Sequence, residues 1–237
     1  RYAFDHYGEK KSRILSFDDA FHGRTLFTVT AGGQPNYRQG FGPLPGGIQH
    51  LPFNDIDALE EAFDSDVCAV IVEPIQGEGG VIAAESGFLE RIRSLCDQHQ
   101  ALMILDEVQT GVGRTGSLYA YQAFDVIPDL LTTAKALGGG FPIAATLSTD
   151  KVAASLGVGT HGSTWGGNPM GCAVANAVLD IVSSPAVLTG VSERRERLEE
   201  RILAIGEQYG VFEQVRGMGL LMGCVLAEPW AGRARDF

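Results

Sequence analysis

The sequence predicts an α/β protein whose mostly parallel sheet is covered by helices on both faces. Residues 67–72 and 101–105 are apolar throughout, as in strands that are buried on both sides. A helix-like stretch with Leu89, Ile92 and Leu95 on one face separates them. Strands of this kind that alternate with helices are typical of a parallel sheet.

The remaining elements follow from similar patterns. Asn54 and Asp55 are suited to cap a helix that runs to Phe63, because their side-chain oxygens accept from free backbone N–H groups. Asn168 followed by Pro169 begins another helix, since proline suits a first helical turn. Further strands are expected at residues 13–17, 130–131, 143–147, 211–215 and 219–225, and an amphipathic helix over about 185–209.

A domain boundary is expected near Ser184. Before it, strands alternate with helices, and after it a long helix leads to two new strands. Residues 1–184 would form a large domain, and residues 185–237 would form the start of a small α+β domain. The long helix carries an apolar stripe of Val187, Leu188, Val191, Leu198, Ile202 and Ile205.

Charge and hydropathy argue against two classes of protein. Lys and Arg number 18 against 29 Asp and Glu, for a formal net charge of −11. A surface this acidic repels phosphate backbones, so a nucleic-acid-binding protein is not expected. The longest apolar runs are far shorter than the ~20 residues that span a bilayer, so no membrane protein is expected either.

The four cysteines show no C-x-x-C spacing, and each lies in an apolar stretch. This pattern favours buried free thiols in a reducing compartment over a disulfide framework or a metal site. We therefore expect a cytoplasmic protein without a bound metal. The residues concerned are Cys68, Cys96, Cys172 and Cys224.

The two ends of the sequence suggest a piece of a longer protein. Arg1 begins it without an initiator methionine and inside a helix-like pattern, and residues 232–237 carry no stop signal. We expect the large domain to be incomplete at its N-terminal end and the small domain at its C-terminal end.

Two candidate catalytic residues follow strands of the predicted sheet, where ligands of parallel α/β proteins bind. Lys135 is the only one of the four lysines in an apolar, glycine-rich stretch. Burial can lower a lysine pKa by up to ~3–5 units and yield the neutral amine that condenses with carbonyls; alternatively, Lys135 reaches solvent. Asp106 ends an apolar strand, where its carboxylate either pairs with a cation such as a pyridinium nitrogen or caps a loop.

A glycine-rich motif at residues 111–116 (GVGRTG) matches the dinucleotide fingerprint G-x-G-x-x-G. That motif requires a strand directly before it, a helix directly after it and an acid at the end of the next strand. Here four residues intervene after Asp106, residues 117–124 give only a short helix, and Asp129 precedes an apolar run. A nucleotide site is therefore not expected.

Three further loops carry polar groups. Residues 20–25 combine an aromatic ring, an imidazole and a guanidinium, unless they simply begin a helix. Residues 73–80 would leave carboxylates on a flexible loop at the ligand end of the sheet. Residues 161–169 set two hydroxyls among glycines before a helix, which suits either a phosphate or a capped helix entry.

Taken in order, the motifs AFHGRT, EPIQGEGG, LDEVQTGVGRTG, AKALGGGFP and HGSTWGGNP resemble those of class III, ornithine-type aminotransferases. These enzymes belong to the fold type I pyridoxal phosphate superfamily. The match covers essentially the whole chain. The stretches TAGGQPNYRQGFGPLPGG and FDSDVCAVIVEPIQGEGG are most similar to bacterial acetylornithine and succinylornithine aminotransferases.

The resemblance implies roles at the matching positions. Lys135 would bind pyridoxal 5'-phosphate covalently and then carry the transferred proton, and Asp106 would pair with the ring nitrogen. Thr164 would reach the cofactor phosphate of the neighbouring subunit, which implies a homodimer. The other cofactor contacts would come from Phe21 and Val108 on the two ring faces, Gln109 near the 3-oxygen, and Glu107. The acylated ornithine would meet Arg24, Ser163 and the specificity-switching carboxylate Glu78.

The chain departs from the family pattern in three places. Trp165 stands where the family more often has tyrosine. The family's glycine-rich loop for the cofactor phosphate would precede Arg1. The arginine that binds the α-carboxylate of glutamate and 2-oxoglutarate would follow Phe237. The resemblance thus covers the central part of such an enzyme.

The implied reaction is transamination of N2-acetylornithine or N2-succinylornithine with 2-oxoglutarate, in arginine biosynthesis or degradation. The products would be the N-acylglutamate semialdehyde and glutamate. The sequence leaves the choice between the two acyl groups open, because both would lie near Arg24. It also leaves open an ornithine, 4-aminobutyrate or other ω-aminotransferase of the same fold, or a non-catalytic binding module.

Overall fold

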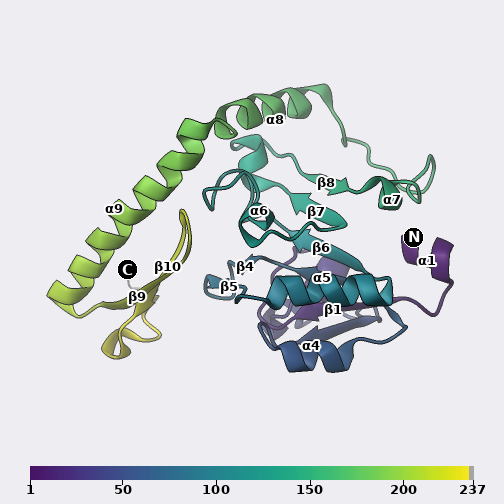
Figure 1. Ribbon diagram of the computed structural model, residues 1–237, viewed down its shortest axis with the longest axis horizontal. Helices are drawn as coiled ribbons and strands as arrows, with labels where there is room; N and C mark the ends of the chain where they lie inside the picture. Colours follow the sequence, from purple (N-terminus) through teal and green to yellow (C-terminus); the bar gives the residue numbers. More distant parts are fainter. Residues whose placement is uncertain (235–237) are drawn as a thin grey trace.

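A six-stranded sheet forms the centre of the computed structural model, which describes residues 1–234 (Figure 1). The strand order is β2-β1-β3-β6-β7-β8, and every neighbouring pair is parallel except β7 and β8. The strands are β1 (Arg13–Phe17), β2 (Ile48–Leu51), β3 (Val67–Val72), β6 (Leu102–Asp106), β7 (Leu130–Thr133) and β8 (Ala145–Ser148). The expected mostly parallel sheet is confirmed, and its last strand forms an antiparallel, exposed edge.

The main hydrophobic core lies on one face of the sheet. Two helices, α4 (Ile56–Ala62) and α5 (Phe88–His99), cover this face. Phe17 and Phe88 meet edge to face at its centre, with their ring centroids 5.4 Å apart. The apolar side of α5 that the sequence predicted is buried in this core, which fixes the strand ends that carry the candidate residues.

A smaller core lies on the opposite face. Tyr2 of α1 (Tyr2–Tyr7) and Val152 of α7 (Asp150–Ala153) are buried there against Ala69. Helices therefore cover both faces, as expected, although the second layer is thin.

Several short elements form the loops around the sheet. They are α2 (Leu26–Ala31), α3 (Pro35–Arg38), α6 (Tyr121–Phe124), β4 (Ile75–Gln76), β5 (Ile82–Ala83), and 3-10 helices at Lys135–Gly138 and Glu228–Trp230. Apart from the short helix at α6, they were not predicted, because elements of two to six residues are too short to show a hydrophobic period.

Beyond Asn168 the chain forms two long helices and a hairpin, as expected. Helix α8 (Pro169–Val182) begins where the Asn168 side chain accepts from the Gly171 N–H, and α9 (Pro185–Tyr209) is bent by 67° relative to it. This bend supports the boundary that we propose near Ser184. Within residues 1–234 no single helix is long and apolar enough to cross a bilayer, and α8 and α9 meet that requirement only as a bent pair. The hairpin consists of β9 (Phe212–Met218) and β10 (Leu221–Leu226).

The apolar stripe of α9 is mostly not buried, and the expectation that all four cysteines are buried is wrong. Among the six apolar stripe residues of α9 only Val191 is buried, because β9 covers just part of the helix; Leu198 is 44% exposed. Cys172 and Cys224 are exposed, since they lie on α8 and on the hairpin, outside the cores. Cys96 is buried as expected, and all four cysteines are free.

Candidate active site

Asp106 ends β6 and is held by three donors. One carboxylate oxygen, Oδ2, lies 2.8 Å from Nδ1 of His22, so this ring nitrogen donates to it. The other, Oδ1, accepts from the Val108 N–H and the Thr132 hydroxyl, each at 3.1 Å. Asp106 is 7% exposed, as its place at the end of an apolar strand predicted. The sequence marked His22 as unusual but did not pair it with Asp106, 84 positions away.

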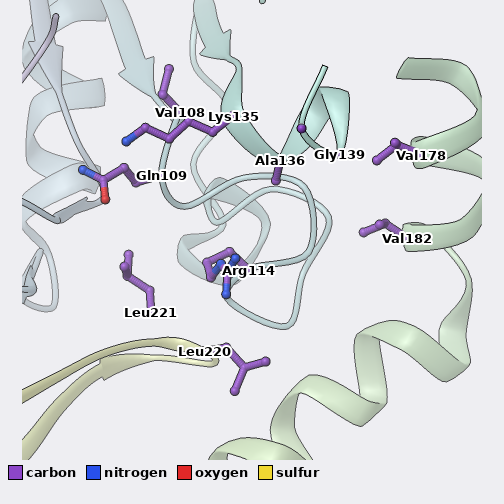
Figure 2. A pocket seen from close by; sticks show the side chains of 11 residues that line it. Val108, Gln109, Arg114, Lys135, Ala136, Gly139, Val178, Val182, Leu220 and Leu221 are labelled. Carbon is purple, nitrogen blue, oxygen red and sulfur yellow. The ribbon is translucent and has the colours of Figure 1, made fainter. Parts of the chain in front are cut away.

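Lys135 follows β7, the strand next to β6, and lines a cavity of about 710 Å³. Val108 and Gln109 line the same cavity, and Figure 2 shows the Lys135 amine directed to their side of it. The backbone of Lys135 has φ +41°, a left-handed conformation that costs of order 1–3 kcal/mol and is concentrated at functional sites. Of the two alternatives for Lys135, the structure has the accessible one, because its side chain borders the cavity and is exposed.

The far wall of this cavity comes from the C-terminal hairpin. Leu220 and Leu221 lie opposite Lys135 across the cavity. In Figure 2, Arg114 lies between Lys135 and Leu220. The hairpin turn is bonded to the glycine-rich segment, since the Leu220 N–H donates to the Arg114 carbonyl at 2.9 Å. The glycine-rich motif at residues 111–116 therefore binds the turn of the hairpin.

Glu73 ties two loops of the site together. One of its oxygens accepts from the Phe21 N–H at 2.9 Å, and the other accepts from the Gly77 N–H at 3.3 Å. Glu73 is 3% exposed, and burial raises the pKa of its carboxyl to about 7, with a smaller lowering by His22 and a raising by Asp106. The expectation of a flexible loop at residues 73–80 is wrong, because Glu73 and the buried strand β4 anchor it.

Gln109 lies against the same loop. A Cβ at Gly77 would approach the Gln109 amide to 2.5 Å, so a larger residue there would displace this amide. The buried Gln109 Nε2 has no hydrogen-bond partner among the described residues. A buried amide nitrogen without a partner is costly, so this group is well placed for an acceptor oxygen on a ligand.

Glu107 differs from the expectation that it contacts the cofactor. Its carboxylate is fully buried and accepts from the N–H groups of Ala120 and Tyr121 and from the Thr110 hydroxyl. Burial raises the pKa of its carboxyl against the effect of these donors. Glu107 therefore holds the turn after β6, and protein donors occupy both of its carboxylate oxygens.

The candidate substrate residues lie at the outer side of the site. Arg24 and Glu78 are exposed, and the Arg24 guanidinium lies 5.3 Å from the centroid of the Phe21 ring. Next to Glu78, the Gly80 carbonyl accepts from Nε of Arg216 on β9 at 2.7 Å. No local pattern pointed to Arg216, because this contact joins segments 136 residues apart.

The loop with Ser163 and Thr164 is not brought to the cavity of Lys135. All residues from His161 to Gly167 are exposed, and Trp165 is 79% exposed. The Ser163 hydroxyl accepts from the Gly166 N–H at 2.9 Å, which shapes the entry to α8. Within residues 1–234 no hydrogen bond joins this loop to Asp106 or Lys135.

The chemistry of the described site fits pyridoxal phosphate. A buried carboxylate suits a protonated ring nitrogen, an accessible lysine suits the aldehyde carbon, and the Gln109 amide suits a ring oxygen. The backbone N–H of Val108 donates to Asp106, and the backbone N–H of Phe21 donates to Glu73.

Comparison with known families decides the assignment. The family model of class III aminotransferases matches residues 1–233. The chain belongs to the class III aminotransferase family. The acetylornithine aminotransferase of Pseudomonas putida is 58% identical over 236 residues, which cover 100% of this chain and 58% of that protein. The succinylornithine transaminase of Citrobacter koseri is 58% identical over 235 residues, 99% of this chain and 58% of that protein.

Solved structures of class III aminotransferases share the fold. The N-acetylornithine aminotransferase from Stenotrophomonas maltophilia matches with a TM-score of 0.83 and 43% identity, over 99% of this chain and 56% of that one. The chain thus has the fold type I architecture, and the cofactor of its family is pyridoxal phosphate. It spans about 58% of the length of the curated relatives that it matches.

Proposed function

We propose that the protein carrying this chain transfers the δ-amino group of N2-acetylornithine or N2-succinylornithine to 2-oxoglutarate, in arginine biosynthesis or degradation. One observation carries the proposal: Lys135, which lines the cavity, follows β7, and Asp106, which is buried and bonded to His22, ends the adjacent strand β6. The names of the relatives, which specify acetylornithine and succinylornithine, support the choice of substrate.

Each residue of the site has a distinct task in this proposal. Pyridoxal phosphate supplies an electron sink that makes the C–H bond beside the substrate nitrogen acidic. Asp106, oriented by His22, provides the negative charge that keeps a proton on the ring nitrogen. Lys135 removes the proton from the substrate carbon with its free amine and returns it on the other side of the transfer. Val108 and Phe21 would hold the two ring faces, Gln109 would donate to the ring oxygen, and Glu78 would influence which amine is accepted.

The attachment of the cofactor to Lys135 is directly testable. Borohydride reduction of the holoenzyme, followed by peptide mapping, should find the cofactor on Lys135. Lys135→Ala should abolish both the label and the absorbance of the cofactor–lysine linkage, and reduce turnover to near background. Lys151→Ala is the control and should keep all three. A label on Lys151 would contradict the assignment, and a protein without any such absorbance would support the non-catalytic alternative.

Substrate preference separates the acylornithine reaction from its alternatives. We expect kcat/KM to be higher for the two acylated ornithines than for free ornithine or 4-aminobutyrate, each measured with 2-oxoglutarate. Higher values for free ornithine or 4-aminobutyrate would replace the proposed substrate while leaving the roles of Lys135 and Asp106 intact.

We further propose a cytoplasmic homodimer in which Thr164 serves the cofactor of the second copy. Its exposure on the loop before α8, away from its own Lys135 cavity, supports this arrangement. Mixing Lys135→Ala with Thr164→Ala subunits tests it. If the site is shared, hybrid dimers regain one site with both residues intact, and activity rises above that of either variant alone. Unchanged activity in verified hybrid dimers would contradict a shared site.

A further inference from the structure

Arg24 lies over the rings of two aromatic residues, Tyr37 and Phe21. Its guanidinium carbon lies 4.0 Å from the centroid of the Tyr37 ring and 5.3 Å from that of Phe21. The two rings meet edge to face, with centroids 5.7 Å apart and planes at 81°. Tyr37 is the nearer of the two rings. Within residues 1–234 no carboxylate forms an ion pair with Arg24.

Tyr37 belongs to a segment that is fastened to the site. It lies on α3, and the Gln34 side chain at the start of α3 donates to the Asp19 carbonyl at 3.2 Å. The Gly33 N–H donates to the Ala20 carbonyl at 2.9 Å. Both bonds attach α3 to the residues directly before Phe21, so the two rings that flank Arg24 are parts of one connected unit.

The stacking leaves a defined part of Arg24 available. A guanidinium carries its five N–H donors in its own plane, so a ring against its flat face does not block them. The free edge is then suited to a carboxylate, which accepts two parallel N–H bonds. Because the ring restricts the side chain beforehand, less conformational freedom is lost when the carboxylate binds.

We propose that Tyr37 is a positioning residue that fixes the plane of the Arg24 guanidinium for a carboxylate of the amino-acid substrate. The inference rests on the proposed function, in which Arg24 contacts the acylated ornithine. It also gives a role to the stretch at residues 30–47, one of the two with the closer likeness to acylornithine aminotransferases. Tyr37 acts on substrate binding through Arg24 and not on proton transfer.

Kinetics of Tyr37 variants in the holoenzyme test this inference. Tyr37→Leu removes the ring face and should raise KM for N2-acetylornithine about 3- to 30-fold, the range that corresponds to a cation–π contact, while kcat changes less than about 2-fold. Tyr37→Phe keeps the face and should restore KM to within about 2-fold of wild type. Phe41→Leu, at an exposed ring of the same segment, is the matched control and should leave KM unchanged. Should leucine destabilise α3, Tyr37→Met repeats the test.

A double variant shows whether Tyr37 acts through Arg24. In an Arg24→Met background, Tyr37→Leu should raise KM by less than about 2-fold, since the guanidinium is gone. A full KM effect in that background, a loss in kcat alone, or an unchanged KM for Tyr37→Leu would each overturn the inference. The proposed function fails separately, if the wild-type enzyme does not transaminate N2-acetylornithine.

Discussion

At the scale of single residues, Asp106 shows how a buried charge becomes useful. Its carboxylate is held by His22, a backbone N–H and the Thr132 hydroxyl, which together fix its direction. The arrangement is built before any ligand arrives, so little reorganisation is needed when charge develops in the reaction.

Replacement of Asp106 by asparagine should separate shape from charge. Asp106→Asn retains the size of the side chain but removes the negative charge that holds the proton on the ring nitrogen. We expect the single-turnover half-reaction with N2-acetylornithine to slow on the order of 10²- to 10³-fold, as for removal of one preorganised electrostatic partner. Stopped-flow absorbance measures this rate, and a near-normal value would exclude the pairing.

Glu73 makes the stability of the protein depend on pH. Burial raises its pKa from 4.5 to about 7, so the folded state binds this proton more tightly than the unfolded state. Its contribution to stability is therefore complete below about pH 4.5 and is lost as the pH rises through about 7. The total amounts to roughly 3 kcal/mol at 1.36 kcal/mol per pKa unit.

Glu73→Gln should remove this dependence. Urea unfolding measures the free energy of unfolding of wild type and variant. We expect the wild-type value minus the variant value to fall by roughly 2 to 3 kcal/mol from pH 5 to pH 8. Loss of the hydrogen bond to Gly77 adds an offset that is the same at both pH values. Glu90→Gln, at an exposed position of α5, should show no such change. An equal change there would mean that the effect comes from the net charge of the protein and not from the burial of Glu73.

At the scale of elements, the β9–β10 hairpin is attached to the large sheet's loops at two places. Arg216 bonds to the Gly80 carbonyl, and the Leu220 N–H bonds to the Arg114 carbonyl. In Figure 1 the hairpin lies between α9 and the loop of β4 and β5. The loop that carries Glu78 is thus held from its own domain by Glu73 and from the hairpin by Arg216.

Arg216→Met should loosen the loop of residues 77–81 while leaving the sheet unaffected. A charge-assisted hydrogen bond contributes about 1.5–3 kcal/mol, so local opening should become roughly 10- to 100-fold more frequent. Amide hydrogen exchange over these residues measures the change. Arg197→Met, at an exposed position of α9, is the control, and equal protection of the loop in both variants would show that Arg216 does not hold it.

Gly219 at the hairpin turn should tolerate no side chain. Its φ is +51°, and an added Cβ would lie 2.6 Å from the Thr115 backbone carbon. Gly210, at the end of α9, has a similar φ of +63° but open space around it. Gly210→Ala therefore measures the backbone strain alone, and Gly219→Ala should destabilise by about 1–3 kcal/mol more, from overpacking. Equal losses in chemical unfolding would mean that the hairpin is not seated on this segment.

At the scale of the whole molecule, the sequence predicted repeating patterns well and distant pairs poorly. The strands at residues 13–17 and 67–72, and the helix at 185–209, follow from hydrophobic period and capping residues, which are local. The pairing of His22 with Asp106 and the stacking of Tyr37 on Arg24 depend on how the chain folds back. No local pattern specifies such contacts.

Exposure was the property that the sequence predicted least well. Lys135 lies in an apolar stretch, yet its side chain is exposed because it borders a cavity. Conversely, Glu73 and Glu107 are charged but buried, since backbone N–H groups satisfy their carboxylates. The burial of a side chain depends on its contacts in the folded structure. Composition indicates only the average burial expected for each residue type.

The exposed edge of the sheet should make the 237-residue chain self-associate. All four residues of β8 are exposed, and Leu147 is 47% exposed. Leu147→Lys places a charge on this edge and should reduce light scattering at a given concentration. Val158→Lys adds the same charge at an exposed apolar residue outside the sheet and should have a smaller effect. Equal effects of the two variants would attribute the change to net charge.

The order of translation separates Lys135 from the hairpin residues that lie opposite it. Leu220 and Leu221 emerge about 85 residues after Lys135, and at about 5–20 residues per second this interval lasts roughly 4 to 17 s on the ribosome. During that time Lys135 has already been translated, but the hairpin residues that line its cavity have not. The hairpin side of the cavity is therefore translated only after all six strands of the central sheet.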